Sequence, residues 1–77
     1  MNRERREQLK KAQALLQQAK EILAEVGGME EEAFDNMPEA FQEGERGEKM
    51  QEYIDTMDEA IGELDDLTET LEEVIFG

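Results

Sequence analysis

The sequence contains no cysteine, no histidine and no serine, and each absence removes a class of chemistry. Without cysteine, neither a disulfide bond nor a thiolate-bound metal can stabilise the fold. Without histidine, cysteine or serine, the usual general base and the usual nucleophiles of enzymes are missing. A di-metal carboxylate bundle also needs histidine, and no calcium-binding loop of the Asp-x-Asp-x-Asp-Gly type occurs. We therefore predict a non-enzymatic protein with no metal site and no cofactor.

The chain is also short and has no long apolar run. Its 77 residues predict one domain, residues 1–77. Such a domain buries only ~60% of its unfolded surface, so oligomerisation is the remaining common source of stability. No segment approaches the ~20 apolar residues of a membrane span, and the first six residues lack the apolar run of a signal peptide. We expect a soluble, cytoplasmic protein without membrane contact.

The net charge of −14 is extreme for this length. Nucleic acids and anionic membranes are polyanions, so the charge disfavours both as direct partners and favours a basic protein. The charge is also uneven. Residues 1–24 carry six Lys or Arg against three Glu, whereas residues 25–77 carry two against nineteen acidic residues. The simplest interpretation of this richness in acids is a well-solvated helix surface.

Apolar residues in the second half of the chain recur at alternating spacings of three and four, which predicts a long helix over residues 45–75. Ile54, Ile61 and Ile75 each follow one of these positions and widen the apolar stripe, so the helix is expected to contact more than one neighbour. The predicted seam consists of Met50, Tyr53, Met57, Ala60, Leu64, Leu67, Leu71 and Val74.

A second seam predicts a helix over residues 3–35, with Asn2 as its N-cap. Gly27 and Gly28 would ordinarily end a helix, but the seam continues in phase beyond them, and both glycines fall on the solvent side of the heptad. One helix, weakened or bent at the glycines, is therefore favoured, and a break at residues 27–28 is the alternative. The seam consists of Leu9, Ala12, Leu16, Ala19, Leu23, Val26, Ala33 and Met37, with Leu15 and Ile22 beside it.

Residues 36–44 form the predicted connector, in which Pro38 suits the start of a single helical turn before Gly44. The two helices have matched lengths, so we predict an all-α, antiparallel helical hairpin of coiled-coil type. Phe34, Met37 and Phe41 are expected to close its bend. The core and oligomer seam is predicted to comprise Leu9, Leu16, Leu23, Met50, Met57, Leu64 and Leu71.

The predicted hairpin also brings opposite charges together. The first helix starts with a basic cluster and the second ends with an acidic cluster, and each has the charge that its own helix dipole disfavours at that end. In the hairpin the two clusters lie side by side and can neutralise each other. Apolar edges remain uncovered, so a homodimeric four-helix bundle is the simplest assembly, with a higher ring or a hetero-complex left open. The clusters are Arg3, Arg5, Arg6, Lys10 and Lys11, and Glu69, Glu72 and Glu73.

Acidic doublets repeat every seven residues on the outward positions of the second helix. They advance ~10.5 Å per repeat, and only doublets approach the ~3.4 Å spacing of phosphates along one DNA strand. This row can occupy the DNA site of a basic, nucleic-acid-handling protein and inhibit it. Two alternatives remain open: a merely solubilising face, or a structural adaptor that acts by oligomerisation. The row comprises Glu52, Asp55, Asp58, Glu59, Asp65, Asp66, Glu72 and Glu73.

The bend sequence Asn36-Met37-Pro38-Glu39, with Gln42 and Glu45-Arg46 after it and Glu30-Glu31-Glu32 before it, resembles a group of small, mostly uncharacterised phage and prophage proteins. The resemblance covers roughly residues 20–75 and implies two helices around this bend. It departs from the group at Gly27-Gly28, Phe34 and Gly44. It implies a setting inside a bacterial host, where small acidic phage proteins often block defence or DNA-handling machinery, and it supplies no site residues.

Overall fold

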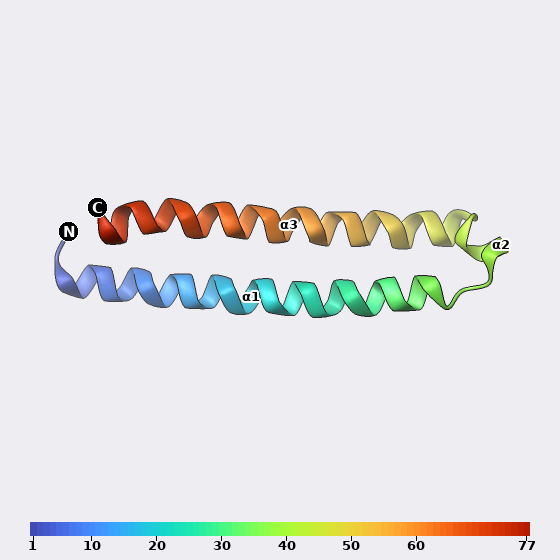
Figure 1. Ribbon diagram of the computed structural model, residues 1–77, viewed down its shortest axis with the longest axis horizontal. Helices are drawn as coiled ribbons and strands as arrows, with labels where there is room; N and C mark the ends of the chain where they lie inside the picture. Colours follow the sequence, from blue (N-terminus) through green and yellow to red (C-terminus); the bar gives the residue numbers. More distant parts are fainter.

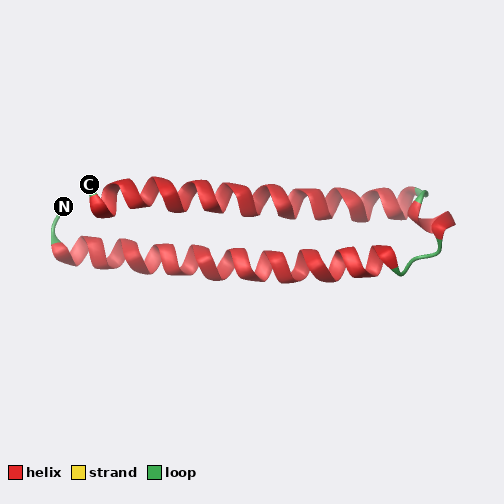
Figure 2. Cartoon of the chain, in the orientation of Figure 1, coloured by secondary structure: helices red, strands yellow, loops and turns green.

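The chain folds into two long helices that lie side by side and run in opposite directions (Figure 1). The computed structural model describes all 77 residues, in which α1 spans Arg3–Asp35, α2 spans Glu39–Gln42 and α3 spans Glu45–Phe76. The chain contains no strand (Figure 2). The molecule measures 58 × 15 × 12 Å, and its two termini lie together at the end opposite α2. The protein is all-α, with the architecture of an antiparallel helical hairpin.

Helix α1 is continuous through the glycine pair. Its first turn is capped by Asn2, whose side-chain oxygen accepts a hydrogen bond of 2.9 Å from the backbone N–H of Arg5. Gly27 and Gly28 both keep negative φ angles, so neither adopts the left-handed conformation that ends many helices. The seam around the glycines, rather than the glycines themselves, determines the length of α1. The sequence predicted 3–35 for this helix and 45–75 for the other.

The bend is a compact corner built by residues of and around α2. The carbonyl of Pro38 accepts hydrogen bonds from the backbone N–H groups of Phe41 and Gln42, at 2.9 and 3.1 Å. The Gln42 side chain donates to the carbonyls of Phe34 and Met37, also at 2.9 and 3.1 Å, and so ties the corner to the end of α1. Phe34 and Met37 are partly buried as predicted, whereas Phe41 is exposed.

Gly47, in the first turn of α3, lies directly against the backbone of Gln42 and is buried. A Cβ atom at this position would overlap the carbonyl group of Gln42, so only glycine allows α3 to start this close to α2. This close approach fixes how α3 is rotated about its own axis where it enters the hairpin.

One row of residues on each long helix faces the other helix. On both helices the row recurs at alternating spacings of three and four residues, as heptad packing requires. All members are partly or fully buried, and the α3 row includes the two buried isoleucines. These contact rows consist of Leu9, Gln13, Leu16, Lys20, Leu23, Gly27, Glu30 and Phe34 on α1, and of Gly47, Met50, Ile54, Met57, Ile61, Leu64, Thr68, Leu71 and Ile75 on α3.

On α3 every second position of the contact row lies one residue later than predicted. Tyr53, Leu67 and Val74 were expected in the seam, but they are exposed, and the residues after them lie inward. Ile54 and Ile75 are only 3% and 2% exposed. Both rows satisfy the same spacing rule, and in the row that is buried these two isoleucines are removed almost completely from water. The predicted core residues on this helix, Met50, Met57, Leu64 and Leu71, lie in the contact row and are partly buried.

On α1, too, every second position of the contact row lies one residue later than predicted. The predicted core residues Leu9, Leu16 and Leu23 keep their places in the contact row and are partly buried. Val26 and Ala33, which the seam included, are exposed. Gly27 is partly buried, so the prediction that both glycines face solvent was wrong for this residue and right only for Gly28. As a consequence, the row that faces α3 carries the polar residues Gln13, Lys20 and Glu30.

A second, wholly apolar row of α1 is turned away from α3. Each of its members directly precedes a contact-row residue and is therefore turned from it by roughly 100° around the helix. Leu15, Ile22 and Met29 in this row are 65%, 59% and 58% exposed. This outer apolar row consists of Ala12, Leu15, Ala19, Ile22, Val26, Met29 and Ala33.

Two glycine substitutions test how far backbone packing decides stability. Gly28→Ala places a methyl group in open space within a helix, and it should raise the free energy of unfolding by ~1 kcal/mol. Gly47→Ala forces the corner apart and should lower it by ~1–3 kcal/mol despite the same gain in helix propensity. Urea unfolding followed by circular dichroism measures both. Equal effects of the two substitutions would contradict the close contact at Gly47.

Candidate interaction surfaces

The predicted acidic row lies along the outside of α3. All eight of its carboxylates are exposed, and their positions fall outside the contact row of the helix. The row runs along the length of the helix from Glu52 to Glu73. The residues are Glu52, Asp55, Asp58, Glu59, Asp65, Asp66, Glu72 and Glu73.

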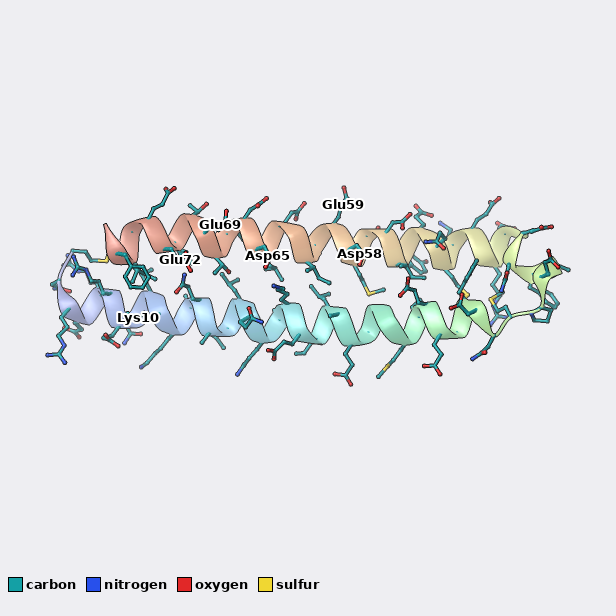
Figure 3. The ribbon with its side chains drawn as sticks, viewed as in Figure 1. Lys10, Asp58, Glu59, Asp65, Glu69 and Glu72 are labelled. Atoms are coloured by element: carbon teal, nitrogen blue, oxygen red, sulfur yellow. The ribbon has the colours of Figure 1, made fainter.

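Each acidic doublet divides between two directions. Asp58, Asp65 and Glu72 directly follow contact-row residues, and they lie at the edge of α3 nearest α1 (Figure 3). The second members are turned by about a further 100°, as Glu59 shows by pointing away from α1. The doublets therefore form a broad acidic surface that wraps α3 rather than a single file of paired charges.

Few cations neutralise this surface. Lys20 reaches across from the contact row of α1 to Asp65, with 2.6 Å between Nζ and Oδ1. Lys49 lies 3.7 Å from Glu52 on the same helix. The remaining members of the row outside these two pairs have no Lys or Arg within ion-pair distance. They are Asp55, Asp58, Glu59, Asp66, Glu72 and Glu73.

The basic cluster at the start of α1 does not form the ion pairs expected with the end of α3. The chain termini do lie side by side, but the only ion pair of the cluster is within α1, from Lys10 to Glu7 at 3.3 Å. In Figure 3 Lys10 lies on α1 across from Glu72, without a bond between them. The remaining cations of the cluster, Arg3, Arg5, Arg6 and Lys11, have no ion-pair partner within the chain.

Polar residues inside the contact row connect the two helices, and the predicted seam missed them. The Gln13 side chain donates a hydrogen bond of 3.0 Å to the backbone carbonyl of Thr68, while the Thr68 hydroxyl donates within α3 to the carbonyl of Leu64 at 2.9 Å. Together with the pair of Lys20 and Asp65, this gives two direct polar bonds between α1 and α3. The only sequence signal for them was the second row with the same spacing, one residue later.

The apolar side of the hairpin lies opposite the bond between Lys20 and Asp65. The axes of α1 and α3 lie in one plane, and a rotation of 180° about an axis perpendicular to this plane exchanges two antiparallel helices. Equivalent heptad positions of α1 and α3 therefore lie on the same side of the plane. Residues that precede contact-row positions on the two helices therefore share one side. We call this the apolar side; it combines the outer apolar row of α1 with a mixed row of α3, in which Tyr53, Ala60, Leu67 and Val74 alternate with Lys49, Thr56, Glu63 and Thr70.

Features typical of catalytic or metal sites are few. No group of three Asp or Glu side chains is placed to hold a metal ion. One hollow, lined by six residues at the N-terminal end, lies away from the acidic row. Neither long helix has an apolar stretch that could cross a bilayer. The acidic row and the apolar side are thus the two extended surfaces on which a functional argument can be built.

Comparisons with protein-family models, with curated proteins and with solved structures find no match. The resemblance to phage proteins at the bend therefore stays a prediction, and any functional conclusion rests on the surfaces of the hairpin.

A double-mutant cycle tests the bond between Lys20 and Asp65. The Lys20 side chain is one third exposed, so Lys20→Met combined with Asp65→Asn should give a coupling energy of ~0.5–1 kcal/mol that decreases with added salt. The matched control is Lys49→Met with Glu52→Gln, a longer and more exposed pair, which should couple by less than ~0.5 kcal/mol. Unfolding in urea at two salt concentrations measures both cycles, and equal coupling would contradict the bond between helices.

Proposed function

We propose that this chain is a non-enzymatic interaction protein that assembles into a homodimeric four-helix bundle and binds a basic protein through the acidic row of α3. The observation that supports it most directly is the contrast between two surfaces of one hairpin. One surface is an almost uninterrupted display of carboxylates, and the other is apolar and exposed. Self-association covers the apolar side and leaves the acidic row accessible.

The partner proposed for the acidic row is a nucleic-acid-handling or defence protein of a bacterial host. Such a protein holds its ligand with Lys and Arg side chains that contact regularly spaced phosphates. The acidic row offers charges at a repeat of ~10.5 Å along a straight helix, and most of them are free of cations. Occupation of the DNA site by this row would inhibit the partner. The phage setting comes from the resemblance at the bend and is part of the proposal.

Loss of carboxylates from the row should weaken capture of such a partner. Asp58→Asn combined with Asp66→Asn and Glu72→Gln removes three free charges, and we expect about tenfold weaker binding. Binding of the unchanged chain should fall as salt rises and should be competed by duplex DNA. Pull-down from a bacterial lysate, followed by titration of the captured protein, measures these effects.

The matched control removes three exposed carboxylates elsewhere, through Glu25→Gln, Glu31→Gln and Glu43→Gln. It makes the net charge less negative by the same amount but leaves the row intact, so capture should stay within about twofold of the unchanged chain. Failure to recover any basic protein, or equal weakening in both variants, would overturn the mimicry proposal.

A second candidate function is favoured by the exposed apolar side alone: a structural or adaptor bundle that acts by oligomerisation. Side chains as large as Leu15 and Ile22 are more than half exposed in a chain that carries net charge −14. A contiguous exposed apolar surface of this kind marks an interaction site. Under this candidate, function would survive neutralisation of the acidic row and would be lost when assembly is prevented.

Assembly is tested by sedimentation velocity at micromolar concentration. The unchanged chain should have twice the mass of one chain, and Ile22→Asp should be monomeric while keeping its helical signal, because a charge on the outer apolar row opposes burial. Gln17→Asp adds the same charge on another side of α1 and should remain dimeric. A monomer in the unchanged chain would contradict the four-helix bundle.

A further inference from the structure

Charge is distributed unequally along the length of the hairpin. The half that contains the bend, residues 20–61, carries fourteen Asp or Glu against three Lys or Arg, a net charge of −11. The open half, residues 1–19 and 62–77, carries eight against five, a net charge of −3. The difference arises because five of the eight cations lie in the first turns of α1, beside the chain termini.

Two copies can pack apolar side to apolar side with two-fold symmetry in two ways. If the axis runs along the hairpin, both bends lie at the same end, and α1 packs on α3 of the other copy. If the axis runs across the hairpin, the bends lie at opposite ends, and α1 packs on the second α1. Both arrangements make four-helix bundles with antiparallel neighbours, so spacing of apolar residues alone does not separate them.

The net charges of the two halves of the hairpin decide between the two arrangements. Screening in physiological salt acts over ~8 Å, whereas the centres of the two halves lie some 25 Å apart, so each half interacts mainly with the half that it touches. Bends at the same end would place −11 directly against −11. Bends at opposite ends place −11 against −3 at both ends, which greatly reduces repulsion between the copies.

The apolar residues favour the same arrangement. With bends at opposite ends, the outer apolar row of α1 packs on itself around a centre between Ala19 and Ile22. Ala19 then faces Ile22 of the other copy, and Ala12 faces Met29, so small residues oppose large ones. With bends at the same end, this row would instead oppose the side of α3 that Lys49 and Glu63 interrupt; with bends at opposite ends, those two residues face the second α3 and the row of α1 meets apolar residues only.

Charged residues at the edge of the outer apolar row also favour the arrangement with bends at opposite ends. Lys11 and Glu32 share one heptad position on the edge of α1, and both are exposed. Packing of α1 on the second α1 brings Lys11 of each copy across from the partner's Glu32. Lys11 has no ion-pair partner within its own chain, so this contact would supply one.

We propose that two copies of this chain associate through their apolar sides with their bends at opposite ends, so that the two α1 helices form the central apolar seam. The proposal rests on the homodimer proposed above and adds its orientation. It identifies the second copy as the occupant of the apolar side from the contact between Lys11 and Glu32 of the two copies and from the self-matching of the outer apolar row.

Distances between labels on the two copies decide the orientation. Gln8→Cys introduces the only cysteine, on an exposed position near the basic end of α1, and allows one spin label per chain. With bends at opposite ends, position 8 faces position 33 of the other copy, so the two labels should lie ~35–40 Å apart. With bends at the same end they would lie within ~20 Å, because neighbouring helix axes are ~10 Å apart.

Sedimentation of the labelled chain separates failure of the orientation from failure of the dimer. A dimer with labels at ~35–40 Å supports the inference. A dimer with labels within ~20 Å overturns the orientation and leaves the homodimer in place. Sedimentation of the unlabelled, unchanged chain as a monomer, or as an assembly of any other size, overturns both.

A charge exchange at the rim gives a second readout that needs no label. Lys11→Glu should weaken the dimer about five- to tenfold, because two symmetric contacts turn from attraction to repulsion. Adding Glu32→Lys restores the original net charge and the contact, so the dissociation constant should return to within about twofold of the original. A double variant as weak as Lys11→Glu alone would overturn the pairing of the two α1 helices.

Discussion

The contact between α1 and α3 is the constraint on which every other surface of the molecule depends. A helix can face only one neighbour with a given strip of its surface, and α1 carries two strips of equal spacing. The strip that faces α3 is the more polar one, so the wholly apolar strip is left outside. The direction that the acidic row faces follows from the same choice, because with Ile54 and Ile75 buried the first residue of each doublet lies at the edge of α3 nearest α1.

The closure of the bend explains why this choice is possible. Gly47 lets the first turn of α3 lie against the backbone of Gln42, and the Gln42 side chain bonds to the last turn of α1. The relative rotation of the two long helices is therefore set at one end by backbone packing. Farther along, the bonds of Gln13 to Thr68 and of Lys20 to Asp65 hold the same rotation with polar groups.

Helix type and the antiparallel order followed from the sequence because heptad spacing and matched lengths are strong signals. The direction in which each helix faces did not, because two rows one residue apart fit the same spacing, and Tyr53 and Ile54 are both good core residues. The deciding features were a backbone contact at Gly47 and the partial burial of polar side chains such as Lys20, and neither is visible in a hydrophobic pattern. The exposure of the acidic row was predictable, since its charges lie away from both candidate rows.

The corner at α2 has a consequence for how the length of such a protein can change during evolution. The rotation of α1 and α3 relative to each other is fixed at the bend. Residues seven apart on each long helix lie on the same side of the hairpin. Lengthening both arms by one such repeat would extend each surface without mixing them, whereas a change of any other length would twist one arm out of step. Reach along an elongated partner could thus be adjusted in steps of ~10.5 Å, with the corner left untouched.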